Sequence, residues 1–154
     1  MKKSLLLSAG IAYLTVILVS GGCSSNNGQV SEEPQKKVTV YLRSIEINKK
    51  KHLSMFDTNG NLDINDSLVT YVMAGGTVIW DLDKASGIKE IDRIYSKSNG
   101  PIFREDAKGI LFSKKFRLEV PEGLTGGTQE EYFIDYYDQN GSKITRDPYL
   151  RIVP

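Results

Sequence analysis

Apolar and polar residues alternate in several short segments of this chain, and this period of two is the feature that most restricts its fold. In the first segment, Val38, Val40 and Leu42 are each separated by one residue. The same alternation returns at 69–73, 78–82, 116–120, 132–136 and 150–152. Such alternation is typical of β-strands that bury one face. Long helical segments do not separate these strands, so the sequence argues against a parallel βαβ sheet and predicts an all-β domain.

Glycine, proline and asparagine mark the predicted turns between these strands. Gly75-Gly76 predicts a tight connection between two neighbouring strands, and Pro121 ends a third. Asn140-Gly141 is typical of a type I′ β-hairpin. Short strands joined by such turns predict an antiparallel Greek-key β-sandwich over residues 37–154, which are enough to enclose a core.

One segment departs from the strand pattern. Ile88, Ile91, Ile94 and Tyr95 recur at a spacing of three and four residues, behind Ser86 as a possible N-cap. That spacing predicts a short helix or helical turn. The predicted fold therefore contains at most one short helix.

The segment 75–80, with the sequence Gly-Gly-Thr-Val-Ile-Trp, is similar to cupredoxin-like domains, which often carry a glycine before an apolar strand that ends in Trp or Phe. This resemblance implies a cupredoxin-like sandwich, with an immunoglobulin-like one as the alternative. A blue-copper centre needs two His and one Cys. His52 is the only histidine and Cys23 the only cysteine, so the copper ligands of that family are absent and we expect no cofactor.

The first 23 residues read as a targeting segment. Lys2 and Lys3 precede the largely apolar stretch 5–19, which is shorter than the roughly 20 residues of a membrane-spanning helix. The small residues of Ser20-Gly21-Gly22 then lead directly to Cys23. This arrangement resembles the bacterial lipoprotein signal, although Ser20 stands where that family more often carries an aliphatic residue.

The resemblance implies that residues 1–22 are a signal peptide and that Cys23 is the acylated first residue of the mature chain. Residues 23–36 are polar and would form a flexible tether to the membrane. Attached acyl chains would hold the protein at the bacterial cell envelope. Ser24 after the cysteine would favour the outer membrane if the source is Gram-negative.

The charge balance excludes partners that need a strongly basic protein. The chain carries 20 Lys and Arg against 19 Asp and Glu, a formal charge of +1. Loss of Lys2 and Lys3 with the signal peptide would leave 18 against 19, or −1. A nearly neutral surface argues against nucleic-acid binding.

A loop over residues 57–66 has the spacing of a weak calcium-binding motif. Its oxygen-bearing side chains at the first, third, fifth and seventh places are Asp57, Asn59, Asn61 and Asp63. Leu62 stands where the sharp turn of an EF-hand needs Gly, and Leu68 stands where a bidentate Glu belongs. We therefore expect an ordinary turn at Asn59-Gly60 and no metal site.

Two other groups of charged residues are candidates for chemistry. The run Lys49-Lys50-Lys51-His52 could meet anionic headgroups or acidic glycans, but we expect it to be a solvated loop. Glu130, Glu131 and Asp135 could act as the carboxylates of a glycosidase. They lie within a strand that alternates with Tyr132, and we expect them on its solvent-facing side.

These patterns predict a non-catalytic binding or structural module at the cell envelope, with an envelope protein or glycan as partner. The alternative is an envelope enzyme that acts on glycans or peptides through carboxylates. An enzyme should show a cleft with converging carboxylates, whereas a binding module should show an exposed apolar or tyrosine patch. The tyrosines that could line such a patch are Tyr41, Tyr71, Tyr132, Tyr136, Tyr137 and Tyr149.

Overall fold

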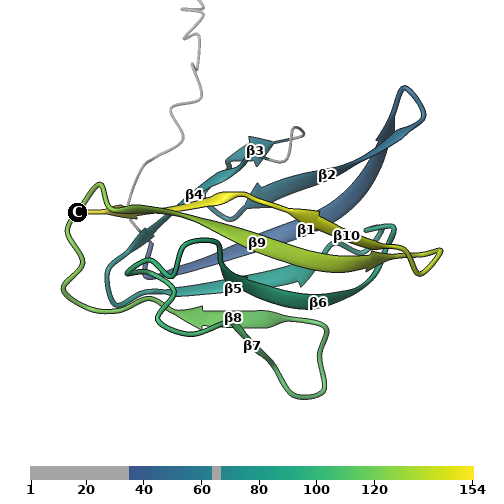
Figure 1. Ribbon diagram of the computed structural model, residues 1–154. Helices are drawn as coiled ribbons and strands as arrows, with labels where there is room; N and C mark the ends of the chain where they lie inside the picture. The colour runs from purple at the N-terminus through teal and green to yellow at the C-terminus, as the bar shows by residue number, and fades with distance from the viewer. Residues whose placement is uncertain (1–34, 64–66) are drawn as a thin grey trace, which may run out of the picture.

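The computed structural model describes residues 35–63 and 67–154, which form a β-sandwich of eleven strands in two sheets (Figure 1). The described residues contain no helix. The predicted signal peptide, Cys23 and nearly all of the tether lie outside the described residues, as do Ile64, Asn65 and Asp66 of the predicted calcium loop.

The first sheet has six strands in the order β3-β2-β1-β5-β8-β7. Their bounds are β1 Lys37–Ile47, β2 Lys50–Asp57, β3 Leu62–Asp63, β5 Thr77–Leu82, β7 Lys108–Gly109 and β8 Phe116–Glu119. All neighbours are antiparallel except β1 and β5, which run parallel.

The second sheet has β9 at its centre. Its strands are β4 Val69–Met73, β6 Ile88–Ser96, β9 Gln129–Asp138, β10 Lys143–Arg146 and β11 Tyr149–Val153. β10 and β11 pair with successive parts of β9, and β6 pairs with β9 as well. β11 and β4 run parallel. The predicted all-β sandwich is confirmed, but both sheets are mixed, because each contains one parallel pair of strands among its antiparallel neighbours.

The predicted tight connection at Gly75-Gly76 is present between β4 and β5, but these two strands do not pair with each other. It carries the chain from β4 in the second sheet to β5 in the first. The backbones come so close that a Cβ atom on Gly76 would lie 2.8 Å from the carbonyl oxygens of Lys36 and Met73. Glycine is required here because the chain crosses between sheets at close quarters, and a crossing and a hairpin turn look alike in sequence.

The predicted helix is a β-strand, β6, and its register explains the error. The pairing of β6 with β9 shifts between Ile88 and Glu90 and again between Ile91 and Arg93. Each β-bulge inserts one additional residue between inward-facing positions. Ile88, Ile91 and Ile94 are consequently all buried although they are three residues apart. Two bulges thus imitate the period of a helix.

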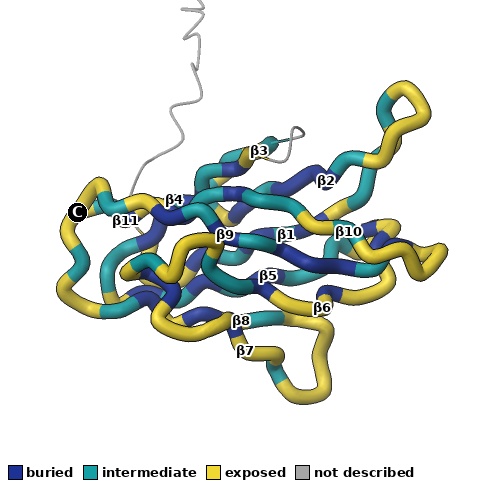
Figure 2. Tube along the Cα trace, in the orientation of Figure 1, coloured by how far each residue is buried: buried dark blue, intermediate teal, exposed yellow. Residues whose placement is uncertain are grey.

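The inward faces of both sheets form one core (Figure 2). Its largest fully buried side chains are Trp80 of β5 and Tyr132 and Tyr136 of β9. The Trp80 Nε1 atom donates a hydrogen bond to Tyr132 Oη at 3.0 Å, and the two rings meet edge to face at 5.5 Å. Burial raises the pKa of Tyr132 well above its ordinary value. The sequence alternation in β1, β5, β8 and β9 is confirmed by this core.

The β9–β10 hairpin is present, but its turn is not the predicted type I′. Gly141 has a φ of 81°, whereas Asn140 does not have a positive φ. Asp138 N donates to Ser142 O and Gly141 N donates to Asp138 O, both at 3.0 Å. These bonds are typical of a type I turn followed by a glycine bulge. Asn-Gly predicted the position of the hairpin and not its turn type.

Candidate binding face

The turn after β2 repeats the turn after β9 almost atom for atom. Asp57 N donates to Asn61 O and Gly60 N donates to Asp57 O, both at 3.0 Å, and Gly60 has a φ of 87°. The Asp57 Oδ1 atom accepts from the backbone N of Asn59 and Asn61, as Asp138 Oδ1 accepts from Asn140 and Ser142. Both aspartates therefore hold three-residue turns in place.

The side chains of the weak calcium motif form hydrogen bonds within the protein. The second carboxylate oxygen of Asp57 accepts from the Asn61 amide at 2.9 Å, and Asp63 Oδ2 accepts from Ser67 Oγ at 2.9 Å. The Asn59 amide donates to Tyr71 O at 2.9 Å. Across 35–63 and 67–154, no three Asp, Glu, His or Cys side chains are grouped as metal ligands. The carboxylate oxygens of Asp57 and Asp63 thus accept hydrogen bonds within the turn and its neighbours, whereas the buried side-chain oxygen of Asn59 has no hydrogen-bond partner among the described residues.

The basic run lies at the tip of the β1–β2 hairpin. Asn48 and Lys49 both have positive φ values, 51° and 62°, and form its two-residue turn. Lys49 and Lys50 are exposed, as expected, but Lys51 forms an ion pair with Asp138. This pair ties the β1–β2 hairpin to the β9–β10 turn.

Glu130 faces the core, which corrects the expectation that it faces solvent. It has the same parity in β9 as Tyr132 and is only 4% exposed. Its carboxylate accepts hydrogen bonds from the backbone N atoms of Ile102 at 2.7 Å and Phe103 at 3.2 Å, and from Ser96 Oγ. A Cβ atom on Gly100 would lie 2.5 Å from the Glu130 carboxyl carbon, so glycine makes room for this contact. Glu130 anchors the loop between β6 and β7.

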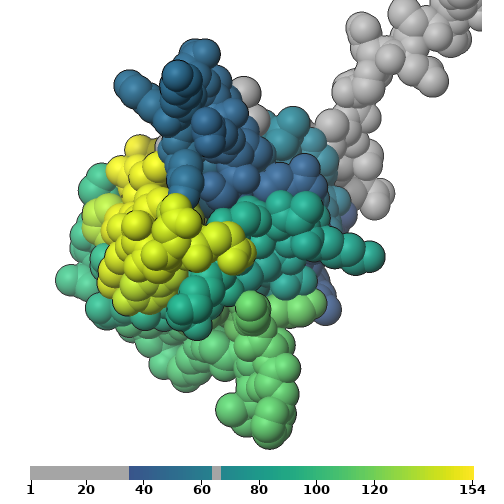
Figure 3. All heavy atoms as spheres, turned by 90° about the vertical axis from the view of Figure 1, so that its right-hand side faces the viewer, coloured from purple at the N-terminus to yellow at the C-terminus, as the bar shows by residue number. Residues whose placement is uncertain are grey.

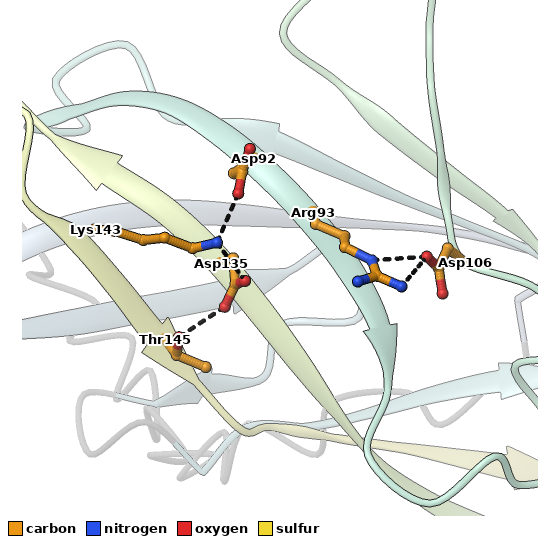
Figure 4. A network of polar contacts seen from close by, with 6 residues as sticks. All are labelled: Asp92, Arg93, Asp106, Asp135, Lys143 and Thr145. Atoms are coloured by element: carbon orange, nitrogen blue, oxygen red, sulfur yellow. Dashed lines mark hydrogen bonds and ion pairs between the residues drawn. The ribbon is translucent and has the colours of Figure 1, made fainter.

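Glu131 and Asp135 lie on the outer face of β9, where both form side-chain contacts, but Asp135 is only 6% exposed, which corrects the expectation that it is open to solvent. Asp135 contacts Lys143 Nζ at 2.9 Å and Thr145 Oγ1 at 2.6 Å, and Lys143 also pairs with Asp92 (Figure 4). Burial raises the pKa of Asp135, but the Thr145 and Lys143 contacts outweigh it and hold this pKa below the ordinary value. Glu131 pairs with Lys97 at 2.7 Å.

Two adjacent hollows, of about 330 and 350 Å³, lie beside β8. Their carboxylates come from Glu105, Asp106 and Glu119, and each is paired: with Lys108, with Arg93, and with Arg117. Glu130, Glu131 and Asp135 do not line these hollows. The carboxylates expected of an enzyme are thus not brought together there.

The predicted tyrosines divide into two groups. Tyr132 and Tyr136 are fully buried, whereas Tyr41, Tyr71, Tyr137 and Tyr149 are partly exposed. Tyr41 stacks on Phe56 with ring centroids 5.0 Å apart and an interplanar angle of 20°. In the strand register, Phe56 is opposite both Tyr41 and Leu62, and Leu62 is 68% exposed. Leu62, Phe56 and Tyr41 form an apolar row across β3, β2 and β1 on the outer face of the first sheet.

The second sheet also carries an aromatic pair outside, but cations cover it. The rings of Tyr95 and Phe133 are 5.3 Å apart. Arg93 lies over Tyr95 at 4.4 Å and Lys97 lies over Phe133 at 5.4 Å. Among the described aromatic residues, these two carry the cation–π contacts. The apolar row on the first sheet lacks such a cover.

The sequence patterns did not predict that Phe56 and Leu62 belong to an exposed apolar face. Leu53 and Met55 are buried in β2, so the alternation that places Phe56 on the outside is present in residues 53–56. This alternation did not lead to a predicted strand, because the lysines at 49–51 come just before it and a run of charged residues is more typical of a loop. Only the register of β1, β2 and β3 shows that Tyr41, Phe56 and Leu62 are neighbours.

No known family model matches this chain, and no curated protein matches it. The described residues include no helix long and apolar enough to cross a membrane.

Proposed function

We propose that this protein is an acylated lipoprotein of the bacterial cell envelope whose β-sandwich is a non-catalytic binding module. Acylation at Cys23 is supported by the charged and apolar residues before it and by the polar tether after it. Binding is supported above all by one observation. The apolar row of Leu62, Phe56 and Tyr41 lies on the outer face of the first sheet, where water would otherwise cover it.

The chemistry of this row suits an envelope protein or a glycan as partner. Tyrosine is enriched in binding surfaces because its ring offers apolar area and its hydroxyl offers a hydrogen bond. The stacked Tyr41 and Phe56 rings form a continuous platform. Asp81 of β5 lies opposite Tyr41 in the strand register, at the margin of this platform. A partner would cover the rings and make polar contacts at this margin.

A non-catalytic role is supported by the way the carboxylates are used. Glu130 binds backbone N–H groups in the core, and Asp135 is held by Lys143 and Thr145. Catalytic carboxylates of glycosidases need to face one substrate together. Here Glu130 and Asp135 lie on opposite faces of β9.

Capture from native envelope with the full chain tests this proposal. We expect the wild-type chain to retain a partner and the double variant Tyr41→Ser, Phe56→Ser to retain at least about tenfold less, since two buried rings contribute most at the centre of an interface. Phe133→Ser removes a ring from the other sheet and should retain the partner. Equal capture by the double variant, at an unchanged unfolding temperature, would refute the proposed face.

The same preparations distinguish the enzyme alternative. We expect no turnover of glycan, ester or peptide substrates by the wild-type chain. Hydrolysis that disappears on substitution of Glu130, Glu131 or Asp135 would favour an envelope hydrolase instead.

A further inference from the structure

The hairpin formed by β7 and β8 projects from the sandwich and ends in two exposed apolar side chains (Figures 1 and 3). Leu111 is 84% exposed and Phe112 is 106% exposed, the two highest values among the described large hydrophobic residues. Neither residue belongs to the core cluster. These two side chains therefore contribute nothing to packing within the domain.

The backbone holds this tip in a conformation that is unfavourable for its sequence. Ser113 N donates to Ile110 O at 3.1 Å, and Ile110 N donates to Lys115 O at 2.8 Å. The third residue of the resulting turn is Phe112, with a φ of 60°. Glycine or asparagine is the usual residue at such a position, because a Cβ atom is strained there. Phe112 is therefore both strained and unburied, a combination that packing within the domain does not explain.

The turn is also fixed before any partner arrives. Ser113 Oγ donates to Ile110 O at 2.9 Å and accepts from Lys115 N at 3.2 Å. The apolar tip is consequently presented without a large loss of loop entropy on binding.

Three lysines lie behind the tip. The loop and β7 carry Lys108, Lys114 and Lys115 and no acidic residue between 108 and 115. Lys108 and Lys115 each pair with one carboxylate, of Glu105 and Asp81. Lys114 Nζ donates to the carbonyl oxygen of Lys89 at 2.9 Å, a contact that leaves its positive charge uncompensated. The two apolar side chains are thus followed closely in sequence by one uncompensated positive charge, that of Lys114.

We propose that the β7–β8 tip inserts Leu111 and Phe112 into the interfacial layer of an anionic lipid bilayer. Apolar side chains next to lysines are suited to that layer, because the apolar groups enter the acyl boundary while the ammonium groups contact lipid phosphates. A fluid bilayer can accept a projecting tip without a preformed pocket. A protein partner would need a pocket that is complementary to Leu111 and Phe112. The inference is independent of Cys23, since the tip belongs to a different part of the chain.

Fluorescence of the full chain in vesicles tests this inference. Phe112→Trp places a reporter at the tip, and Leu62→Trp places a matched one on the exposed β3. Trp80 is fully buried and supplies a constant background in both variants. Each variant is reconstituted from detergent into phosphatidylcholine vesicles that contain about one quarter phosphatidylglycerol and brominated acyl chains.

We expect the Phe112→Trp emission to shift to the blue and to be quenched by the brominated chains, and the Leu62→Trp emission to do neither. Adding Leu111→Ser or Lys114→Gln should lower the quenched fraction severalfold, whereas Lys84→Gln, an exposed lysine elsewhere, should not. Quenching should persist in a Cys23→Ser chain, which separates the tip from acylation.

Several results would overturn the inference. Equal quenching of the two reporters, or none, would show that the tip does not enter the bilayer. Equal quenching without phosphatidylglycerol would refute the role of the lysines. Absence of quenching together with a crosslink from position 112 to an envelope protein would assign the tip to a protein partner.

Discussion

At the scale of single residues, the core depends on one buried polar contact between two large rings. Trp80 and Tyr132 are both fully buried, and the indole N–H has Tyr132 Oη as its partner. Phe103 stacks on Tyr132 at 5.2 Å and so joins the β6–β7 loop to the same cluster. Removal of the indole would leave a cavity and a hydroxyl without its donor.

We expect Trp80→Ala to lower the free energy of unfolding by about 3 to 5 kcal/mol, as for other large-to-small changes in cores. Trp80→Phe keeps an aromatic ring and should cost less. Urea unfolding of the full-length variants measures both values. A loss under about 1 kcal/mol for Trp80→Ala would contradict the buried position of the ring.

Under the lipoprotein proposal, localisation depends on Cys23. If it is acylated, Cys23→Ser should abolish incorporation of labelled palmitate and leave the precursor with its first 22 residues attached. Metabolic labelling and the mass of the product measure this, with Ser24→Ala as a control that keeps the cysteine. Normal labelling of the Cys23→Ser chain would contradict the lipoprotein assignment.

At the scale of elements, two turns of similar sequence, residues 57–61 and 138–142, are each held by the aspartate that ends the preceding strand. Asp57 and Asp138 both accept two backbone N–H groups through Oδ1. The turns thus have the same internal bonds although they belong to different sheets. Each aspartate therefore stabilises its own turn through these two hydrogen bonds.

We therefore expect Asp57→Ala to destabilise the fold by about 1 to 2 kcal/mol, because two partly buried N–H groups lose their acceptor. Asp138→Ala should cost at least as much, since it also breaks the pair with Lys51. Millimolar calcium should leave the unfolding temperature of the wild-type chain unchanged. A calcium-dependent rise that Asp57→Ala removes would instead establish a metal site.

The elements also show where the sequence was sufficient and where it was not. Alternation located β1, β4, β5, β8, β9 and β11 because each buries one face, and Trp80, Ile134 and Tyr136 are at 0% exposure as it requires. It failed for β6, where two bulges change the period, and the Gly75-Gly76 turn did not reveal that the chain changes sheets there. The apolar row could not be predicted from the sequence, because its residues lie on three strands and the register of those strands depends on contacts between distant residues.

At the scale of the whole molecule, ion pairs tie the separate hairpins and sheets together and make stability depend on pH. Lys51 pairs with Asp138, and Lys143 pairs with Asp135 and Asp92. The hydrogen bond from Lys51 holds the pKa of Asp138 below its ordinary value of 3.8, as the contacts of Asp135 do for that residue. The unfolded chain therefore takes up protons first when the pH falls.

We expect the free energy of unfolding to be constant between about pH 5 and neutral pH and to decrease between about pH 5 and pH 2, as these carboxylates become protonated. Asp135→Asn should flatten this decrease, while Glu122→Gln, at an exposed position after β8, should leave it unchanged. Chemical unfolding at several pH values measures the slope. Stability that rises on acidification would contradict the assigned directions.

We propose that the first sheet of this sandwich meets a partner at the cell envelope through Tyr41, Phe56 and Leu62. Site-specific photocrosslinking in living cells tests it most directly, with a benzophenone amino acid in place of Phe56 and, as a matched control, in place of Phe133. The account predicts a discrete crosslinked species from position 56 that is absent or much weaker from position 133. No crosslink at position 56, or the same species from both positions, would contradict it.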